Sequence, residues 1–215
     1  MAPLTQSNLK REFDRLRKSL TQRAKEAGQA FPQAESNRRK ERGRELLRFL
    51  EIYLPHYMPD AHYSEFHVEF SNLSNPLAHG ARWPGLRLVL AAPRGNGKTT
   101  LLKALILQML CLERKKFILL ISDSVEQAAE TLEAVKLELE ENPRLAVDFP
   151  NAVGAGDSWS AGQVVTNHGA KVKAFGTGKR IRGASHGVQR PDLIILDDLE
   201  NDEQVATPAG RDKLD

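Results

Sequence analysis

The sequence predicts an α/β fold, a mostly parallel sheet with flanking helices, preceded by a basic helical arm. Short aliphatic segments alternate with helical patterns from residue 86 onward, and strands separated by helices form parallel sheets with right-handed crossovers. A glycine-containing turn joins the first of these segments to an apolar helix. Residues 1–48 contain thirteen Lys and Arg against six Asp and Glu, a net charge of +7, whereas the remainder carries −4 of the total +3.

The arm is expected to comprise residues 1–45. Apolar side chains recur at steps of three and four over residues 9–27, which predicts a helix with one apolar stripe. A break is expected over residues 28–37, and a second basic helix from about residue 36 to residue 54, where Pro55 follows. The positive charge suggests contact with a polyanion, and a solvated helical face is the alternative.

The main domain is expected to comprise residues 46–215. Ser64 is a residue type that caps helices, so a third helix should follow it. Residues 75–85 contain two prolines and two glycines and are expected to form a loop. Residues 193–196 are four aliphatics, which predicts a strand buried on both faces.

The remaining elements follow from periodicity and turn residues. Strands are expected at residues 86–92 and 117–122, with a hairpin of two short strands at 163–167 and 171–175. Helices are expected at residues 98–112 and, capped by Asp123 or Ser124, from about residue 125 to residue 141, where Pro143 ends the pattern.

The strongest motif lies within LRLVLAAPRGNGKTTLLKAL, residues 86–105. Glycines before a helix let backbone N–H groups approach phosphate oxygens, and the helix N-terminus adds positive potential. Lys98 is expected to reach the β- and γ-phosphates of a nucleotide, and the Thr99 hydroxyl to bind Mg²⁺. The alternative is a glycine-rich turn in which Lys98 is merely solvated. The predicted ligand-binding residues of this segment are Pro93, Arg94, Gly95, Asn96, Gly97, Lys98, Thr99 and Thr100.

Acidic side chains follow the last predicted strand. Ligand chemistry in α/β sheets lies at the carboxyl ends of strands, so Asp197 is predicted to hold Mg²⁺. A second acid must orient or deprotonate the attacking water, and Asp198 and Glu200 both remain candidates. The alternative for this segment is a buried strand that ends in a polar turn. Residues 175–190, rich in glycine and arginine, should bring a cation near the same place.

These motifs together resemble the ATPase domain of the large terminase subunit of tailed bacteriophages. The resemblance covers about residues 45–215 and rests on APRGNGKT, IRGASHGVQRPDLIILDDLEND and the TPAGRDKLD tail. It implies a P-loop NTPase of the additional-strand (ASCE) class that binds ATP and Mg²⁺. It also implies that Arg182 acts across a subunit boundary and that Arg94 is the arginine of the phosphate loop. Adenine would be read by His67, for which a packed core histidine is the alternative.

The family's activity is translocation of double-stranded DNA into a procapsid by a homo-oligomeric ring, with a portal protein and a small terminase subunit as partners. It would take place in the cytoplasm of a bacterial host. The chain has one cysteine, Cys111, and neither a signal-peptide segment nor a membrane-spanning run. A full terminase continues into a nuclease domain, so the chain is expected to be a fragment or a truncated product. A helicase-like motor and a non-catalytic nucleotide- or DNA-binding remnant are the other hypotheses.

Overall fold

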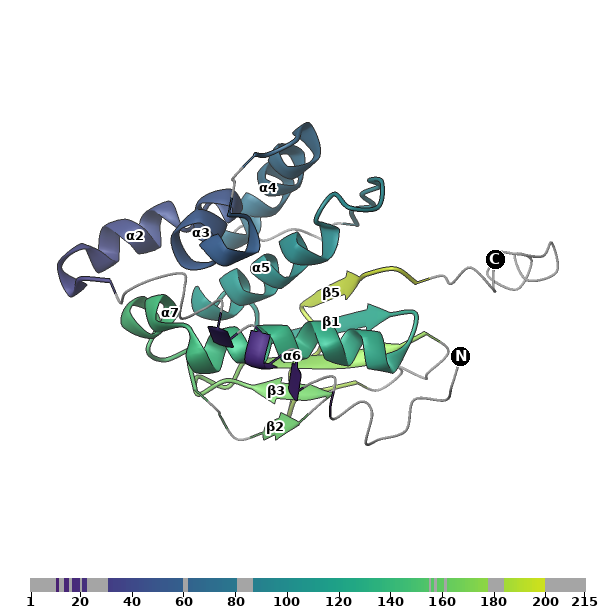
Figure 1. Cartoon of the computed structure of the whole chain (residues 1–215). Coiled ribbons are helices and arrows are strands. Elements are labelled where there is room, and N and C mark those ends of the chain that lie inside the picture. The colour runs from purple at the N-terminus through teal and green to yellow at the C-terminus, as the bar shows by residue number, and fades with distance from the viewer. Residues whose placement is uncertain are drawn as a thin grey trace.

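The computed structural model places five strands in one sheet, in the order β2-β3-β4-β1-β5 (Figure 1). The structure describes residues 11, 14–15, 17–19, 21–22, 31–59, 62–80, 87–154, 156, 158–160, 162–177 and 184–199. The strands are β1 (Phe117–Ser122), β2 (Ser158–Ser160), β3 (Gln163–Val165), β4 (Lys171–Gly176) and β5 (Leu193–Leu196).

The sheet is mixed, and the prediction of a mostly parallel sheet is wrong. β1 pairs in parallel with β4 and β5, whereas β3 pairs antiparallel with both β2 and β4. The predicted hairpin between β3 and β4 is confirmed, closed by a hydrogen bond from the Thr166 N–H to the Ala170 carbonyl. A tight turn can join only antiparallel strands, so this hairpin accounts for the mixed sheet.

Outside the sheet, six α-helices and two 3₁₀ turns in the described part of the chain have defined bounds. They are η1 (Gln33–Glu35), α2 (Ser36–Arg42), α3 (Leu46–Tyr53), η2 (Pro55–Tyr57), α4 (Glu65–Ala78), α5 (Lys98–Cys111), α6 (Val125–Glu141) and α7 (Pro143–Asp148). None of these helices is long and apolar enough to cross a bilayer. Of the helix predicted over residues 9–27, the structure describes residues 11, 14–15, 17–19 and 21–22, and all of these are helical. Arg17 forms a 2.6 Å ion pair with Glu140 of α6.

Two helix boundaries differ from the prediction. The single helix expected over residues 36–54 is divided at Gly43, where a side chain would begin only 3.1 Å from Cε2 of Tyr53. The loop expected from residue 75 begins too early, because α4 continues to Ala78 with Pro76 inside it. The Arg114 guanidinium donates a 2.8 Å hydrogen bond to the Ala78 carbonyl, one of those left without a helical partner at this end.

The helices around the predicted sheet core begin and end close to the predicted positions. Of the two predicted caps of α6, Ser124 is the observed one, since its hydroxyl accepts the Gln127 N–H at 3.1 Å. Beyond the end of α6, Asn142 caps a further helix, α7, with Pro143 in its first turn. Proline fits there because its missing N–H is not needed by the helix.

Alternate residues of β1 enter two separate apolar clusters. Ile118 and Leu120 belong to the main core with α5 and α6, whereas Phe117, Leu119 and Ile121 lie on the opposite face. Figure 1 shows α6 lying along the sheet, with α5 and the earlier helices stacked beyond it. Cys111 is buried in the main core as expected, and this burial raises the pKa of its thiol.

β5 exposes one of its faces, so the prediction that both faces are buried is wrong. Ile194 and Leu196 are each 56% exposed, whereas Ile195 is buried in the main core and Leu193 packs against it. Among the described residues, no strand pairs with the outer side of β5. An aliphatic run shows that a strand forms but does not show how many neighbours it has.

The strand predicted at residues 86–92 is not observed over its described part, residues 87–92. Val89 is 96% exposed and Leu88 is 44% exposed, and the segment runs directly into the glycine turn before α5. The β-propensity of this segment is realised only where a partner strand is available, and the described sheet does not supply one.

A buried ion pair joins the N-terminal helices to α7. The Arg39 guanidinium donates from Nε and Nη2 to the two carboxylate oxygens of Asp148, at 2.7 Å each. The Tyr53 hydroxyl donates a third hydrogen bond of 2.8 Å to Asp148, whose side chain is fully buried. Burial by itself would raise the pKa of the Asp148 carboxyl, but the hydrogen bonds from Arg39, Ser36 and Tyr53 hold it below its ordinary value.

Candidate functional site

The candidate site begins at the glycine turn, residues 93–97. Gly95 and Gly97 have φ values of 86° and 65°, in the left-handed region that favours glycine. Gly97 is the N-cap of α5, a helix of 14 residues. The first N–H groups of α5 therefore have no helical partners and point toward the turn, which favours an anion at this position.

Lys98 is held over the turn by the turn's own backbone. Its ammonium donates hydrogen bonds to the Ala92 carbonyl at 2.6 Å and to the Pro93 carbonyl at 3.1 Å. The Asn96 amide donates a further bond to the Pro93 carbonyl, at 3.2 Å. These bonds place the positive charge of Lys98 at the N-terminus of α5. The ammonium and the helix N-terminus both favour phosphate oxygens at this position.

Thr99 and Asp197 meet across the site. The Thr99 hydroxyl donates a 3.0 Å hydrogen bond to Oδ2 of Asp197, which joins the start of α5 to the carboxyl end of β5. Asp197 is positioned by the sheet, because its N–H donates to the Ile121 carbonyl of β1 at 2.9 Å. The two residues lie far apart in the sequence, and the fold brings together the pair predicted to bind Mg²⁺.

The oxygen pair suits Mg²⁺. A hydroxyl and a carboxylate are hard ligands, and Mg²⁺ in nucleotide sites takes one or two protein oxygens and completes its shell with phosphates and water. Thr99 and Asp197 would hold the ion, which would neutralise charge on the phosphates. Within the described residues there is no group of three or more His, Cys, Asp or Glu side chains that could form a metal cage.

Burial destabilises the ionised form of Asp197. The side chain is 9% exposed, and burial raises the pKa of its carboxyl, with a further increase from the charge of Asp198. The hydrogen bond from Thr99 and the charges of Lys103 and Lys98 oppose this shift without cancelling it. The site therefore holds a carboxylate whose charge a bound cation would stabilise.

Asp197→Asn should stabilise the protein in the absence of nucleotide and Mg²⁺. An ionised carboxylate with a raised pKa costs stability, and the cost develops as pH rises from the ordinary Asp pKa to the raised value. At pH 7 the melting temperature of Asp197→Asn should therefore be higher than that of the wild type. The difference should disappear below the ordinary Asp pKa. Thermal unfolding from pH 3 to pH 8 tests this, and a variant less stable than wild type at pH 7 would contradict it.

The two candidates for the catalytic base are not distinguished. Asp198 is exposed and has a φ of 73°, which is uncommon for a residue other than glycine. Its carbonyl accepts the Asp123 N–H at 2.9 Å, so the turn after β5 is fixed against the end of β1. Glu200 lies outside the described residues. Aspartate tolerates this left-handed conformation better than most residues, so the φ of Asp198 does not favour it over Glu200 as the base.

The other predicted site residues fall into three groups. Arg94 is exposed in the glycine turn, and Thr100 lies in the first turn of α5. His67 lies in the first turn of α4 and is 6% exposed, with Nε2 directed at Gly97. Arg182 lies outside the described residues, so its predicted position near the site is not tested.

Lys103 is a residue of the site that the sequence reasoning did not identify. It lies one helical turn after Thr99 on α5, where residues four apart share a face. Burial lowers the pKa of its ammonium, and the charge of Asp197 opposes that shift. In the sequence, the four-residue spacing between Thr99 and Lys103 was the only indication that the two share a helix face. Such spacing does not show whether a lysine faces the site or the solvent.

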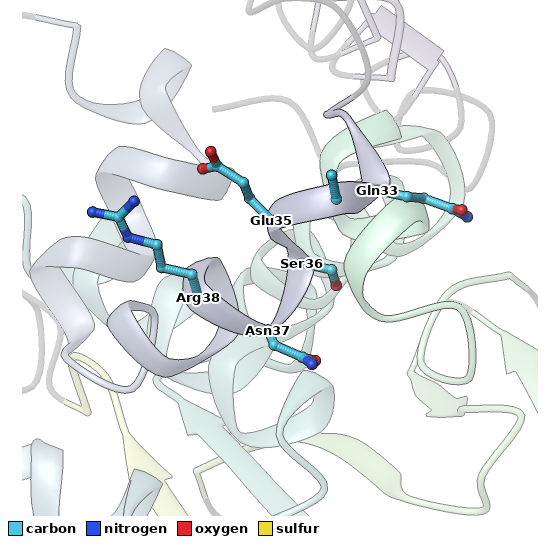
Figure 2. A pocket seen from close by; sticks show the side chains of 6 residues that line it. Gln33, Glu35, Ser36, Asn37 and Arg38 are labelled. Carbon is cyan, nitrogen blue, oxygen red and sulfur yellow. The ribbon is translucent and has the colours of Figure 1, made fainter.

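A hollow of about 470 Å³ lies away from these residues, on η1 and the start of α2 (Figure 2). It is lined by six consecutive residues, and Figure 2 shows the side chains of Gln33 and Glu35 pointing away from each other. The hollow thus has no converging set of polar groups, and we do not assign a ligand to it.

No family model matches the chain, and neither a curated protein nor a solved structure matches it.

Proposed function

We propose that the chain is the ATPase domain of a phage DNA-packaging motor, related to the large terminase subunit. The observation that carries the proposal is the 3.0 Å contact between the Thr99 hydroxyl and the Asp197 carboxylate. It joins a glycine turn that favours phosphate to an acid that favours Mg²⁺, and Mg²⁺-ATP needs both in one place.

In this proposal the protein positions ATP and neutralises charge. Backbone N–H groups at the start of α5 and the Lys98 ammonium bind the phosphates, while Thr99 and Asp197 hold Mg²⁺. Asp198 or Glu200 orients the attacking water. Arg94 binds phosphate from within the turn, and Arg182 stabilises the transferring phosphoryl group from a neighbouring subunit of a ring.

The sheet is consistent with this proposal without defining the class of ATPase. β1 and β5 run parallel, and Asp197 follows β5 at its carboxyl end, where α/β sheets place ligand chemistry. In the described sheet, no strand leads into the glycine turn, because residues 87–92 do not pair with it. The sheet therefore does not identify the additional-strand class of ATPase, and that class is proposed together with the function.

Double-stranded DNA is the proposed polymeric substrate, with portal protein and a small terminase subunit as partners in the bacterial cytoplasm. A packaging motor must accept every sequence, so its DNA contacts should be electrostatic. The net charge of +7 on residues 1–48 supplies a polyanion-binding segment.

Double-stranded DNA should stimulate ATP hydrolysis by the chain, and increased salt should remove the stimulation. The apparent DNA affinity should fall by at least about tenfold between 50 and 200 mM salt, because several phosphate contacts release counterions. Steady-state hydrolysis with random-sequence duplexes measures both effects. Hydrolysis that is stimulated equally at both salt concentrations would argue against electrostatic DNA binding, and unwinding of a forked duplex would favour a helicase-like motor.

A second candidate function is a nucleotide-binding module without turnover. It is favoured by the exposure of Leu88 and Val89, because a glycine turn without a paired strand behind it is less rigidly placed. Binding of Mg²⁺-ATP with no hydrolysis, in the presence and absence of DNA, would support this second candidate over the first.

A further inference from the structure

His67 has one ring nitrogen engaged and one that is not. Nδ1 accepts the backbone N–H of Ser64 at 3.0 Å, at the N-terminus of α4, and it lies 2.7 Å from the Ser64 hydroxyl, which can donate to an unprotonated Nδ1 as well. A neutral imidazole has one acceptor and one donor nitrogen, and a nitrogen that accepts a backbone N–H carries no proton. The contact therefore fixes the tautomer, and Nε2 carries the N–H.

The Nε2–H donor is buried against the glycine turn. His67 is 6% exposed, and Nε2 has no hydrogen-bond partner among the described residues. It lies 3.5 Å from the position that a side-chain carbon on Gly97 would take. Gly97 directly precedes Lys98 and Thr99, so the donor is directed at the phosphate end of the candidate site.

The buried Nε2–H of His67 needs a hydrogen-bond acceptor, and an anion bound at the glycine turn would supply one. Buried donors almost always have an acceptor. The start of α5 presents further N–H groups and the Lys98 ammonium, so this position has an excess of donors. The Met58 methyl group, 3.2 Å from the same position, must move for an oxygen to enter, which a flexible methionine side chain allows.

We propose that His67 binds the phosphate chain of the ligand through Nε2–H, and that it does not read adenine. The inference rests on the proposed nucleotide binding and specifies one contact within it. It replaces the expectation that His67 recognises the base. It also differs from a purely structural histidine, because the contacts of the His67 ring with the cap residue Ser64 use Nδ1 and leave Nε2 unused.

Two substitutions test the donor. In His67→Asn the amide oxygen takes the place of Nδ1 and keeps the contact with the Ser64 N–H, but no atom replaces Nε2. In His67→Gln the longer amide can present its nitrogen at the place of Nε2, and glutamine at this position is also compatible with the capping box. Melting temperatures report the cap, and titrations with Mg²⁺-ATP, Mg²⁺-GTP and inorganic tripolyphosphate report the donor.

His67→Asn should keep the wild-type melting temperature and bind both Mg²⁺-ATP and tripolyphosphate about tenfold more weakly, as expected for loss of one hydrogen bond to a charged group. His67→Gln supplies an amide N–H in place of Nε2 and should bind both ligands within about threefold of wild type. The ratio of ATP to GTP affinity should stay the same in both variants.

Unchanged binding by His67→Asn would overturn the inference and leave nucleotide binding intact. A change in the ATP to GTP ratio, with tripolyphosphate binding unaltered, would return His67 to base recognition and also overturn it. A wild-type chain that binds neither nucleotide nor tripolyphosphate would instead refute the proposed function, and the inference with it.

Discussion

Replacement of Lys98 by alanine should reduce ATP turnover by at least about 100-fold, the scale of losing one preorganised group that stabilises transition-state charge. The ammonium is already held at the start of α5 by the Ala92 and Pro93 carbonyls. Little reorganisation is needed for it to face phosphate oxygens, and alanine supplies no positive charge in its place. Turnover per folded molecule, measured in the presence of Mg²⁺ and DNA, tests this expectation.

Lys115→Ala is the matched control. Lys115 lies in the turn before β1, at the opposite end of that strand from Asp197, and its ammonium donates to the Asp192 carbonyl at 3.1 Å. The control removes the same charge and a similar backbone contact, so it should leave turnover unchanged. Hydrolysis by Lys98→Ala at close to the wild-type rate would refute the ATPase assignment.

Asp148→Asn should lower stability more than any other single change proposed here, by about 3–5 kcal/mol, because it leaves a buried arginine without its counter-charge. Arg39 is 8% exposed and donates two 2.7 Å hydrogen bonds to the carboxylate. An amide can accept only one of them well. The melting temperature should fall by roughly 6–20 °C for a chain of this size.

The wild-type protein should also lose this stabilisation in acid. The pKa of Asp148 is lowered in the folded state, so the contribution is present above the ordinary Asp pKa and is lost as pH falls through the lowered value. Glu51→Gln is the control, since its 2.6 Å pair with Arg48 is partly exposed and should contribute less than about 1 kcal/mol. Equal melting temperatures for the two variants would contradict the importance assigned to the buried pair.

The sequence predicted the elements whose signals are local. The helix after the glycine turn, the strand at residues 117–122 and the helix capped by Ser124 each carry their own periodicity and termini, and all three are observed. Residues 87–92 and 193–196 carry equally strong aliphatic signals, yet the first forms no strand and the second lies at an edge. Pairing depends on which other strands are near, and local pattern does not contain that information.

The sequence predicted those site residues whose role follows from their position next to a strand or a glycine turn. Asp197 at the end of an aliphatic strand and Thr99 after a glycine turn were named independently, and they lie in hydrogen-bond contact. The orientation of His67 was not predictable, because it depends on the crossing of α4 and the turn before α5. The spacing of His67 from Lys98 in the sequence says nothing about which nitrogen faces Gly97.

The most direct test of the central claim is a calorimetric titration of the 215-residue chain with ATP, with and without Mg²⁺. The glycine turn, Lys98, Thr99 and Asp197 together predict saturable binding of one ATP per chain. Removal of Mg²⁺ should weaken this binding, and Lys98→Ala should lose most of it. Absence of saturable binding by a folded wild-type chain, or binding that neither Mg²⁺ removal nor Lys98→Ala weakens, would contradict the proposed site.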